Sequence, residues 1–200
     1  MIPTQESFYS RDELATLGLA SFGEDVRISR KTSFYNSGSI RLGNHVRIDD
    51  FVILAAGVPG IVLGDYIHIS CLCVVHGSAG FTMEDYTGLS AHTVVYSESD
   101  DFSGQSLTFP FFPRRFKPGY LSGRVEMRKH SIVGTNCTLM PGVILKEGSA
   151  VGAHSLVTKS CEPWTIYAGV PATARKARSR DVLDLTRQFH EELLQRQQPR

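Results

Sequence analysis

Four side chains that can hold or transfer protons surround one interruption of this 200-residue sequence. His92 lies one expected strand before a long loop, and its imidazole titrates near neutral pH, so it is a candidate general base. Asp100 and Asp101 stand side by side at the root of the loop, where their carboxylates could hold and orient an ammonium group. His76 lies one repeat before Tyr96, on the strand leading into the loop, and is a second candidate base.

Each of these residues also has a purely structural interpretation. His92 occupies a turn position whose equivalents in later repeats are Asn136 and His154, so it could be a solvated turn residue. The pair Asp100 and Asp101 could simply begin a loop. A reaction without a protein base, or one assisted by the substrate, is a third alternative. The residues alone leave the choice between these roles open.

A repeat of about 20 residues predicts the elements that position these side chains. Segments beginning at Ile40, Ile61 and Phe81 are alike, and their starts lie 21 and 20 residues apart. Each repeat contains six-residue steps that start with an aliphatic residue and continue, four positions later, with a small or β-branched one. Such self-similarity indicates a solenoid whose units bury their apolar sides by stacking. We therefore predict a triangular prism of short parallel strands with two inward columns. The aliphatic column is Leu42, Ile48, Leu54, Leu63, Ile69, Val75, Met83, Leu89, Val95, Met127, Val133, Leu139, Leu145, Val151 and Val157, and the second column is Val46, Val52, Ile67, Cys73, Thr87, Thr93, Ser131, Cys137, Ser149 and Ser155.

Both ends of the chain carry helix signals. Ser10 and Glu13 form a capping box that opens a short helix, and Gly18 is a natural stop. Near the C-terminus an apolar face predicts a packing helix. The members of that face are Val182, Leu185, Phe189 and Leu193. The expected division is an N-terminal helical cap at 1–20, the β-helix at 21–172 with an extended loop at 97–124, and a C-terminal tail and helix at 173–200.

The loop at 97–124 is the one break in the repeat. It is rich in Phe and Pro, shows neither helical nor strand periodicity, and is too long for a simple connection in a compact solenoid. Loops of this kind usually carry function. Its aromatic residues cannot reach the prism interior, so we expect them to bury against the outside of a coil or against a neighbouring subunit.

The overall composition narrows the class of protein. A formal net charge of +1 argues against a nucleic-acid partner. The sequence shows neither a membrane span nor a signal peptide, so we expect a cytoplasmic protein. The cysteines lack metal-ligand spacing, so we expect no metal site. Cys73, Cys137 and Cys161 fall at small-residue positions of the repeat and are interpreted as buried reduced thiols.

Three stretches carry a family resemblance: FYSRDELATLGLASFGEDVRIS, NHVRIDDF and YAGVPATARK. Over residues 8–176 the chain resembles the hexapeptide-repeat acyltransferases. That resemblance implies an all-β fold, a left-handed parallel β-helix, a homotrimer and acetyl-CoA as cosubstrate. The stretch YSESDDFSG resembles the nucleotide-linked amino-sugar N-acetyltransferases more than the maltose and galactoside O-acetyltransferases. Asp100 stands where those O-acetyltransferases have their catalytic histidine, so that residue cannot be carried over.

The resemblance implies an acetyl-CoA-dependent N-acetyltransferase that acts on a dTDP- or UDP-linked amino-deoxy sugar for surface-polysaccharide synthesis. Small outward residues would admit the pantetheine arm, and basic residues near the C-terminus would hold the coenzyme phosphates. These coenzyme candidates are Gly134, Thr135, Gly152, Ala153, Lys159, Arg175 and Lys176. The candidates for the nucleotide sugar are Tyr96, Arg114, Arg115 and Lys117. Two alternatives remain: an O-acetyltransferase of a sugar or lipooligosaccharide hydroxyl, and a non-catalytic hexapeptide scaffold.

Overall fold

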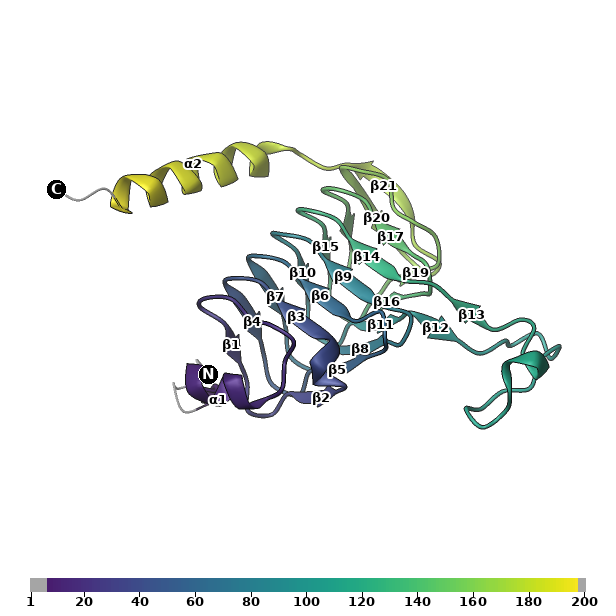
Figure 1. Ribbon diagram of the computed structural model, residues 1–200. Helices are drawn as coiled ribbons and strands as arrows, with labels where there is room; N and C mark the ends of the chain where they lie inside the picture. The colour runs from purple at the N-terminus through teal and green to yellow at the C-terminus, as the bar shows by residue number, and fades with distance from the viewer. Residues whose placement is uncertain (1–6, 198–200) are drawn as a thin grey trace.

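The computed structural model describes residues 7–197 and shows a three-sided parallel β-helix with a helix at each end (Figure 1). The fold class predicted from the sequence, an all-β, left-handed parallel β-helix, is confirmed. Residues 1–6 of the expected N-terminal cap and 198–200 of the expected tail lie outside the described residues. In this described part of the chain, no helix is long and apolar enough to cross a membrane.

Each side of the prism is one sheet, and successive coils contribute successive strands. The first face contains β1 (Arg27–Ile28), β4 (Val46–Ile48), β7 (Ile67–Ile69), β10 (Gly88–Leu89), β15 (Ile132–Val133), β18 (Ala150–Val151), β20 (Thr165–Ala168) and β21 (Thr173–Ala177). The second face contains β2 (Ser33–Tyr35), β5 (Ile53–Ala56), β8 (Val74–Gly77), β11 (Val94–Tyr96), β16 (Thr138–Leu139) and β19 (Leu156–Val157). The third face contains β3 (Ile40–Leu42), β6 (Ile61–Leu63), β9 (Phe81–Met83), β14 (Val125–Met127) and β17 (Ile144–Leu145).

Both inward columns are buried as predicted. On the third face Leu42 pairs with Leu63, Leu63 with Met83 and Met83 with Met127, so equivalent side chains lie directly above one another. Every member of the aliphatic column is at most 4% exposed, and every member of the second column is at most 3% exposed. The predicted buried cysteines Cys73, Cys137 and Cys161 are likewise free thiols in this interior.

The corners of the prism are turns in which one residue per coil has a positive φ. At the corner between the third and first faces, His45, Tyr66, Tyr86 and His130 occupy this position, with φ between 55° and 60°. Their rings stack from coil to coil with centroids 4.5, 5.1 and 4.9 Å apart. The corner between the first and second faces contains Phe51, Leu72, His92, Asn136 and His154 in the same conformation.

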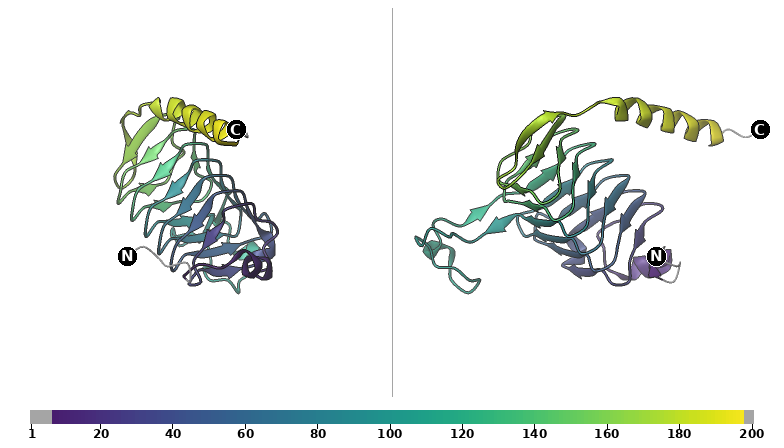
Figure 2. Two further views of the ribbon diagram at one scale, coloured as in Figure 1. Left: turned by 90° about the vertical axis from the view of Figure 1, so that its left-hand side faces the viewer. Right: turned by 180° about the vertical axis from the view of Figure 1, so that it is seen from behind.

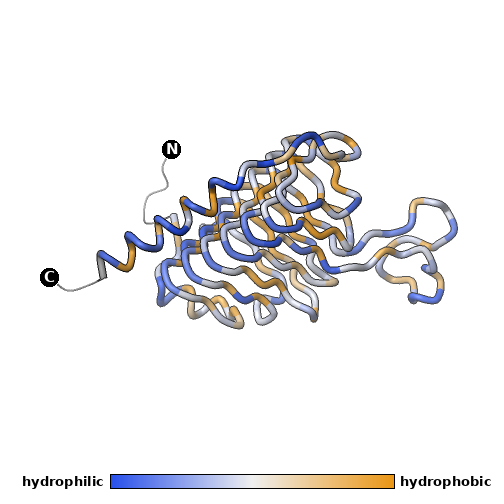
Figure 3. Tube along the Cα trace, turned by 90° about the horizontal axis from the view of Figure 1, so that it is seen from above, coloured by the Kyte–Doolittle hydropathy of each residue, from blue (hydrophilic) through white to orange (hydrophobic). Residues whose placement is uncertain are grey.

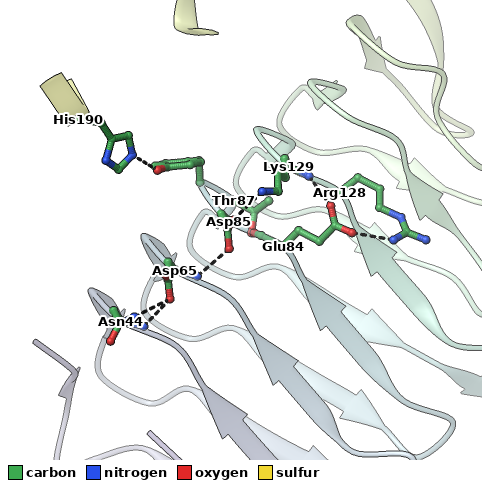
Figure 4. Close-up of polar contacts among 9 residues, drawn as sticks. Asn44, Asp65, Glu84, Asp85, Thr87, Arg128, Lys129 and His190 are labelled. Carbon is green, nitrogen blue, oxygen red and sulfur yellow. Dashed lines mark hydrogen bonds and ion pairs between the residues drawn. The ribbon is translucent and has the colours of Figure 1, made fainter. Parts of the chain in front are cut away.

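Polar side chains beside the first of these corners tie neighbouring coils together (Figure 4). Asp65 Oδ1 accepts hydrogen bonds from the backbone N–H of Asn44 at 2.7 Å and from its side-chain amide at 3.2 Å. The Asp65 backbone N–H donates to Asp85 Oδ1 at 3.1 Å, and Lys129 forms an ion pair with Asp85 at 2.9 Å. These bonds satisfy turn groups that the short strands leave unpaired.

The two terminal helices differ in how they meet the prism (Figures 1 and 2). Helix α1 (Arg11–Thr16) has the predicted capping box between Ser10 and Glu13, and Leu14 covers the end of the core at 2% exposure. Helix α2 (Asp181–Gln197) leaves the last coil and runs back outside the prism, where Phe189 and His190 contact the stacked rings of the corner. The predicted apolar face packs only partly, because Leu185 is 61% exposed and Phe189 is 43% exposed.

Residues 97–124 form an arm that projects from the prism (Figure 1). Its base is a short hairpin of β12 (Glu98–Ser99) and β13 (Leu121–Ser122), which the sequence did not predict. Of the two alternatives expected for its aromatics, burial against a coil of this chain is not found, because the hairpin carries them away from the prism, and burial against a neighbouring subunit stays a prediction. Phe102 and Phe111 are 93% and 94% exposed. Figure 3 shows apolar stretches recurring from coil to coil in the prism, a regularity that the arm lacks.

Candidate active site

A cavity of about 510 Å³ lies where the arm leaves the second face. Strands β8 and β11 place His76 directly beside Tyr96, and both side chains point outward because neighbouring residues of a strand alternate between faces. The two rings stack with centroids 4.9 Å apart and an interplanar angle of 9°. The lining residues are His76, Ser78, Tyr96, Glu98, Ser99, Asp100, Phe102, Tyr120 and Met140.

The same alternation continues beyond β11 into the arm. Tyr96, Glu98 and Asp100 are two residues apart, and all three line the cavity. Glu98 was not predicted from the sequence, although extending the outward column of the strand past Val95 indicates it. Tyr120 was not predicted either, because it comes from the far side of the arm and no local pattern indicates it.

Glu98 organises the base of the arm. Its Oε1 accepts hydrogen bonds from Arg114 at 3.2 Å and from the Ser122 hydroxyl at 3.0 Å, while Oε2 accepts one from the Tyr120 hydroxyl at 3.1 Å. Burial and the nearby Glu98 carboxylate raise the pKa of Tyr120, so this phenol stays protonated as a donor. Both carboxylate oxygens of Glu98 therefore bond to residues of the returning half of the arm and link its two halves.

Asp100 makes a different contact in the same cavity. Its Oδ1 lies 3.0 Å from the Lys117 ammonium, and the Lys117 side chain is 7% exposed while that of Asp100 is 34% exposed. Among the described residues, no hydrogen bond to the second oxygen, Oδ2, is found. One carboxylate oxygen of Asp100 is thus held by the protein, and the other remains free to accept a bond in the cavity.

Asp101 points elsewhere, because neighbouring residues in extended chain face opposite ways. Its two oxygens accept hydrogen bonds from the Ser103 backbone N–H at 2.8 Å and the Ser103 hydroxyl at 2.9 Å. These bonds lower the pKa of Asp101. The structure therefore separates the two aspartates that the sequence placed together: Asp100 lines the cavity and Asp101 closes a turn of the arm.

The two candidate histidines are also separated. His76 lines the cavity, and burial lowers its pKa, so its imidazole is neutral at neutral pH. His92 lies at the corner between the first and second faces with φ +61°, is exposed, and is not among the lining residues. The interpretation of His92 as a solvated turn residue agrees with this position within one chain.

A second, smaller groove of about 350 Å³ runs along the first face. Gly134, Gly152 and Ala153 line it together with Ser90, which the sequence analysis did not select. A Cβ at position 134 would lie 2.7 Å from the backbone nitrogen of Ala153, so glycine is also required there for close stacking of the coils. Thr135 is turned away and donates a hydrogen bond to the Ala91 carbonyl at 2.6 Å.

The basic residues predicted to bind the coenzyme or the nucleotide line neither the cavity nor the groove, although Lys117 contacts Asp100, which lines the cavity. Arg175 donates to the Ala168 carbonyl at 3.0 Å, and Lys159 and Lys176 are exposed at the C-terminal end of the prism. Arg114 lies over the Tyr120 ring at 3.9 Å.

Arg115 lies 4.7 Å from the centroid of the Phe116 ring. Neither Arg114 nor Arg115 lines the cavity. In the described part of the chain, no group of three or more His, Cys, Asp or Glu residues could hold a metal ion.

The chemistry of the cavity is that of an amine site. It offers the carboxylate of Asp100, the neutral imidazole of His76 and aromatic rings. The groove on the adjacent face offers a strip of small residues along which a thin chain can lie against the backbone.

No protein-family model matches the chain. It is 40% identical over 177 residues to the dTDP-4-amino-4,6-dideoxy-D-glucose acyltransferase of Escherichia coli, covering 88% of this chain and 92% of that protein.

Two solved structures of the N-acyltransferase AntD from Bacillus cereus are also similar. The complex of a serine variant with dTDP-4-amino-4,6-dideoxyglucose and coenzyme A has a TM-score of 0.90 at 40% identity, covering 94% of this chain and 100% of that one. The complex with dTDP and 3-hydroxybutyryl-CoA has a TM-score of 0.89 at 42% identity, covering 94% and 98%.

Proposed function

The chain belongs to the family of dTDP-4-amino-4,6-dideoxyglucose acyltransferases, and from this premise we propose that it transfers an acetyl group from acetyl-CoA to the amino group of a dTDP-linked amino-deoxy sugar. The observation that carries the proposal is Asp100, which has one carboxylate oxygen without a hydrogen-bond partner among the described residues and lines a cavity together with the neutral imidazole of His76.

Acyl transfer to nitrogen needs a free amine held against the thioester. Asp100 would accept a hydrogen bond from the sugar amine and direct its lone pair. The nitrogen forms a bond to the thioester carbonyl carbon, the C–S bond breaks, and the proton lost by nitrogen passes through a neighbouring base to the coenzyme thiolate. His76 is the histidine that this cavity contains, and we assign it that proton-transfer role.

A feature of AntD supports the choice of Asp100. Variants of that protein at a serine and at an aspartate ten positions further along have been solved with coenzyme A and either dTDP or dTDP-4-amino-4,6-dideoxyglucose. Ser90 and Asp100 of this chain have the same separation, and they line the groove and the cavity respectively. We propose that both residues contact the acceptor sugar or the acyl group.

The groove on the first face is the proposed coenzyme site. Gly134, Gly152 and Ala153 leave room for the pantetheine arm, and Lys159 and Lys176 would meet the phosphates near the C-terminal end. The groove and the cavity lie on different faces of the prism. A homotrimer would bring the groove of one subunit opposite the cavity of the next, and we propose that assembly.

The nucleotide would lie near the arm, whose aromatic rings are exposed. Tyr96 lines the cavity and could stack on the sugar or the base, whereas Arg114 is held by Glu98. We propose that the product serves surface-polysaccharide synthesis and that the reaction takes place in the cytoplasm.

The deciding experiment is an assay of thiol release from acetyl-CoA with a matched panel of acceptors. Turnover with dTDP-4-amino-4,6-dideoxyglucose, and none with the corresponding dTDP sugar that has a 4-hydroxyl, is the expected result. Turnover with the hydroxyl sugar alone would favour an O-acetyltransferase, and failure to bind coenzyme A in calorimetry would favour a scaffold. Replacing acetyl-CoA with 3-hydroxybutyryl-CoA in the same assay defines the acyl group.

A further inference from the structure

We propose that Lys117 causes the acceptor amino sugar to bind as the neutral free base, because its ammonium group occupies one side of Asp100 and disfavours a second positive charge in the cavity. The proposal rests on the function proposed above and assigns Lys117 as a positioning residue. In the sequence, Lys117 was a candidate for the nucleotide diphosphate; its observed contacts indicate another role.

Lys117 is buried in a part of the arm where its neighbours are exposed. Its side chain is 7% exposed, whereas the Arg114 side chain is 60% exposed. The Lys117 ammonium lies 3.0 Å from Asp100 Oδ1 and 5.1 Å from the centroid of the Tyr120 ring. A short helical turn fixes its backbone, since the Lys117 N–H donates to the Arg114 carbonyl at 2.9 Å and the Tyr120 N–H donates to the Lys117 carbonyl at 3.2 Å.

The charges around the cavity are balanced before any substrate arrives. Glu98 is paired with Arg114, and Asp100 is paired with Lys117. The titratable groups around this cavity come from three places. Strands β8 and β11 supply His76 and Tyr96, and the outgoing half of the arm supplies Glu98 and Asp100. The returning half of the arm supplies Arg114, Lys117 and Tyr120. His76 is neutral at neutral pH. The cavity therefore lacks the net negative charge that would stabilise a bound ammonium.

This balance has a direct consequence for an amine acceptor. An amine that bonds to the free oxygen of Asp100 comes within a few ångströms of the Lys117 cation on the other oxygen. A nearby like charge disfavours an ammonium, so the Lys117 cation offsets the stabilisation that the Asp100 carboxylate would otherwise give to a protonated amine. Transfer from water into the cavity then favours the neutral amine, which supplies the lone pair that attack on the thioester requires.

The test is the pH dependence of kcat, which reports groups in the enzyme–substrate complex. In Lys117→Met, a bound ammonium gains Asp100 as an uncompensated partner. We expect kcat with dTDP-4-amino-4,6-dideoxyglucose to fall about 10-fold or more at pH 7, to recover at high pH, and its rising limb to move up by about 1–2 pH units. Lys117→Arg should keep the wild-type profile. Lys146→Met, which removes an ion pair with Glu162 in the coils, is the matched control.

A purely structural role for Lys117 would give another result. The kcat of Lys117→Met would then be lowered by the same factor at every pH, and this outcome would overturn the proposal. Thermal denaturation of each variant shows whether it is folded. Absence of turnover by the wild-type protein would instead count against the proposed function itself.

A measurement on the wild-type protein keeps the proposal testable if Lys117→Met does not fold. Titration of dTDP-4-amino-4,6-dideoxyglucose into the protein, by calorimetry at neutral pH in two buffers of different ionisation enthalpy, counts the protons exchanged on binding. We expect net proton release. Binding without proton release, or with uptake, would show that the sugar binds as an ammonium and would overturn the proposal.

Discussion

The prism and the arm are ordered by different kinds of contact. In the prism, each inward side chain has an equivalent in the coil above and the coil below, as in the series Leu42, Leu63, Met83 and Met127. The arm lacks such a series, and its order comes from the short hairpin of β12 and β13 and from a few polar groups that converge on Glu98 and Asp100. The prism therefore supplies stability and a straight scaffold that presents His76 and Tyr96, while the arm adds the polar side chains Glu98 and Asp100 that a regular stack does not provide.

The largest expected effect comes from the prism core. Leu139 is fully buried between Val95 and Val157, so Leu139→Ala should lower the free energy of unfolding by about 2–5 kcal/mol. Leu107 in the arm is 46% exposed, and Leu107→Ala should cost less than about 1 kcal/mol. Urea denaturation at one protein concentration measures both. Equal losses would contradict the division of stability between the two regions.

Next in size is the effect of the two neighbouring aspartates of the arm on activity. Asp100→Asn keeps the shape of the side chain but removes its charge, and kcat/KM for the amino sugar should fall about 100-fold. Tm should also fall, because the Lys117 ammonium, with a side chain only 7% exposed, loses its ion-pair partner. Asp101→Asn should change kcat/KM by less than about 3-fold, because that side chain bonds to Ser103 outside the cavity. A reversed order in the steady-state assay would move the acceptor site to Asp101.

Substitutions at two glycines of the first face distinguish the role of this face in stacking the coils from its proposed role in binding the coenzyme. A Cβ at Gly134 would clash with the Ala153 backbone, so Gly134→Ala should destabilise the protein by about 1–3 kcal/mol. A Cβ at Gly88 would make an ordinary contact of 3.5 Å with the His68 carbonyl and would extend into the groove. Gly88→Ala should therefore keep its Tm and raise the Kd for coenzyme A. An unchanged Kd in calorimetry would place the coenzyme elsewhere.

The smallest expected effect is a loss of stability between pH 6.5 and 5, the range in which histidines titrate. The arm does not contribute to it, because residues 97–124 contain no histidine. Burial lowers the pKa of His130, so between this value and the unfolded value of about 6.5 the unfolded chain binds more protons. The stabilisation that His130 contributes is fully present above pH 6.5 and is lost as the pH falls below 6.5. The free energy of unfolding then decreases by at most about 1.4 kcal/mol per pH unit.

Desolvation also lowers the pKa of His76, which contributes in the same direction, so replacing His130 should remove only part of this slope. His130→Asn suits the positive φ of the turn and should flatten the decline between pH 6.5 and 5 in urea denaturation. A slope unchanged from that of the wild-type protein would show that His130 does not titrate in this range.

Most of the prism could be predicted from the sequence because stacking makes each residue type recur at a constant spacing. Leu139 and Cys137 are buried, and the residues equivalent to them in other coils have the same kind of surroundings. The residue type at each of these positions is therefore restricted in the same way in every coil. The same reasoning identified the capping box at Ser10 and Glu13, which depends on residues three apart. The turn position of His92 also followed from the register, since φ is positive at each equivalent residue.

The sequence by itself thus determined the coil register, the inward columns, the short N-terminal helix and the break in the repeat at which the candidate site lies. Only the tertiary structure decided that Asp100 and His76 share a cavity, that Asp101 and His92 lie outside it, and that Lys117 reaches back to Asp100. The physical reason is that periodic stacking fixes which residues meet in the prism, whereas Asp100 and Lys117, 17 positions apart, close a loop through contacts that no local pattern encodes.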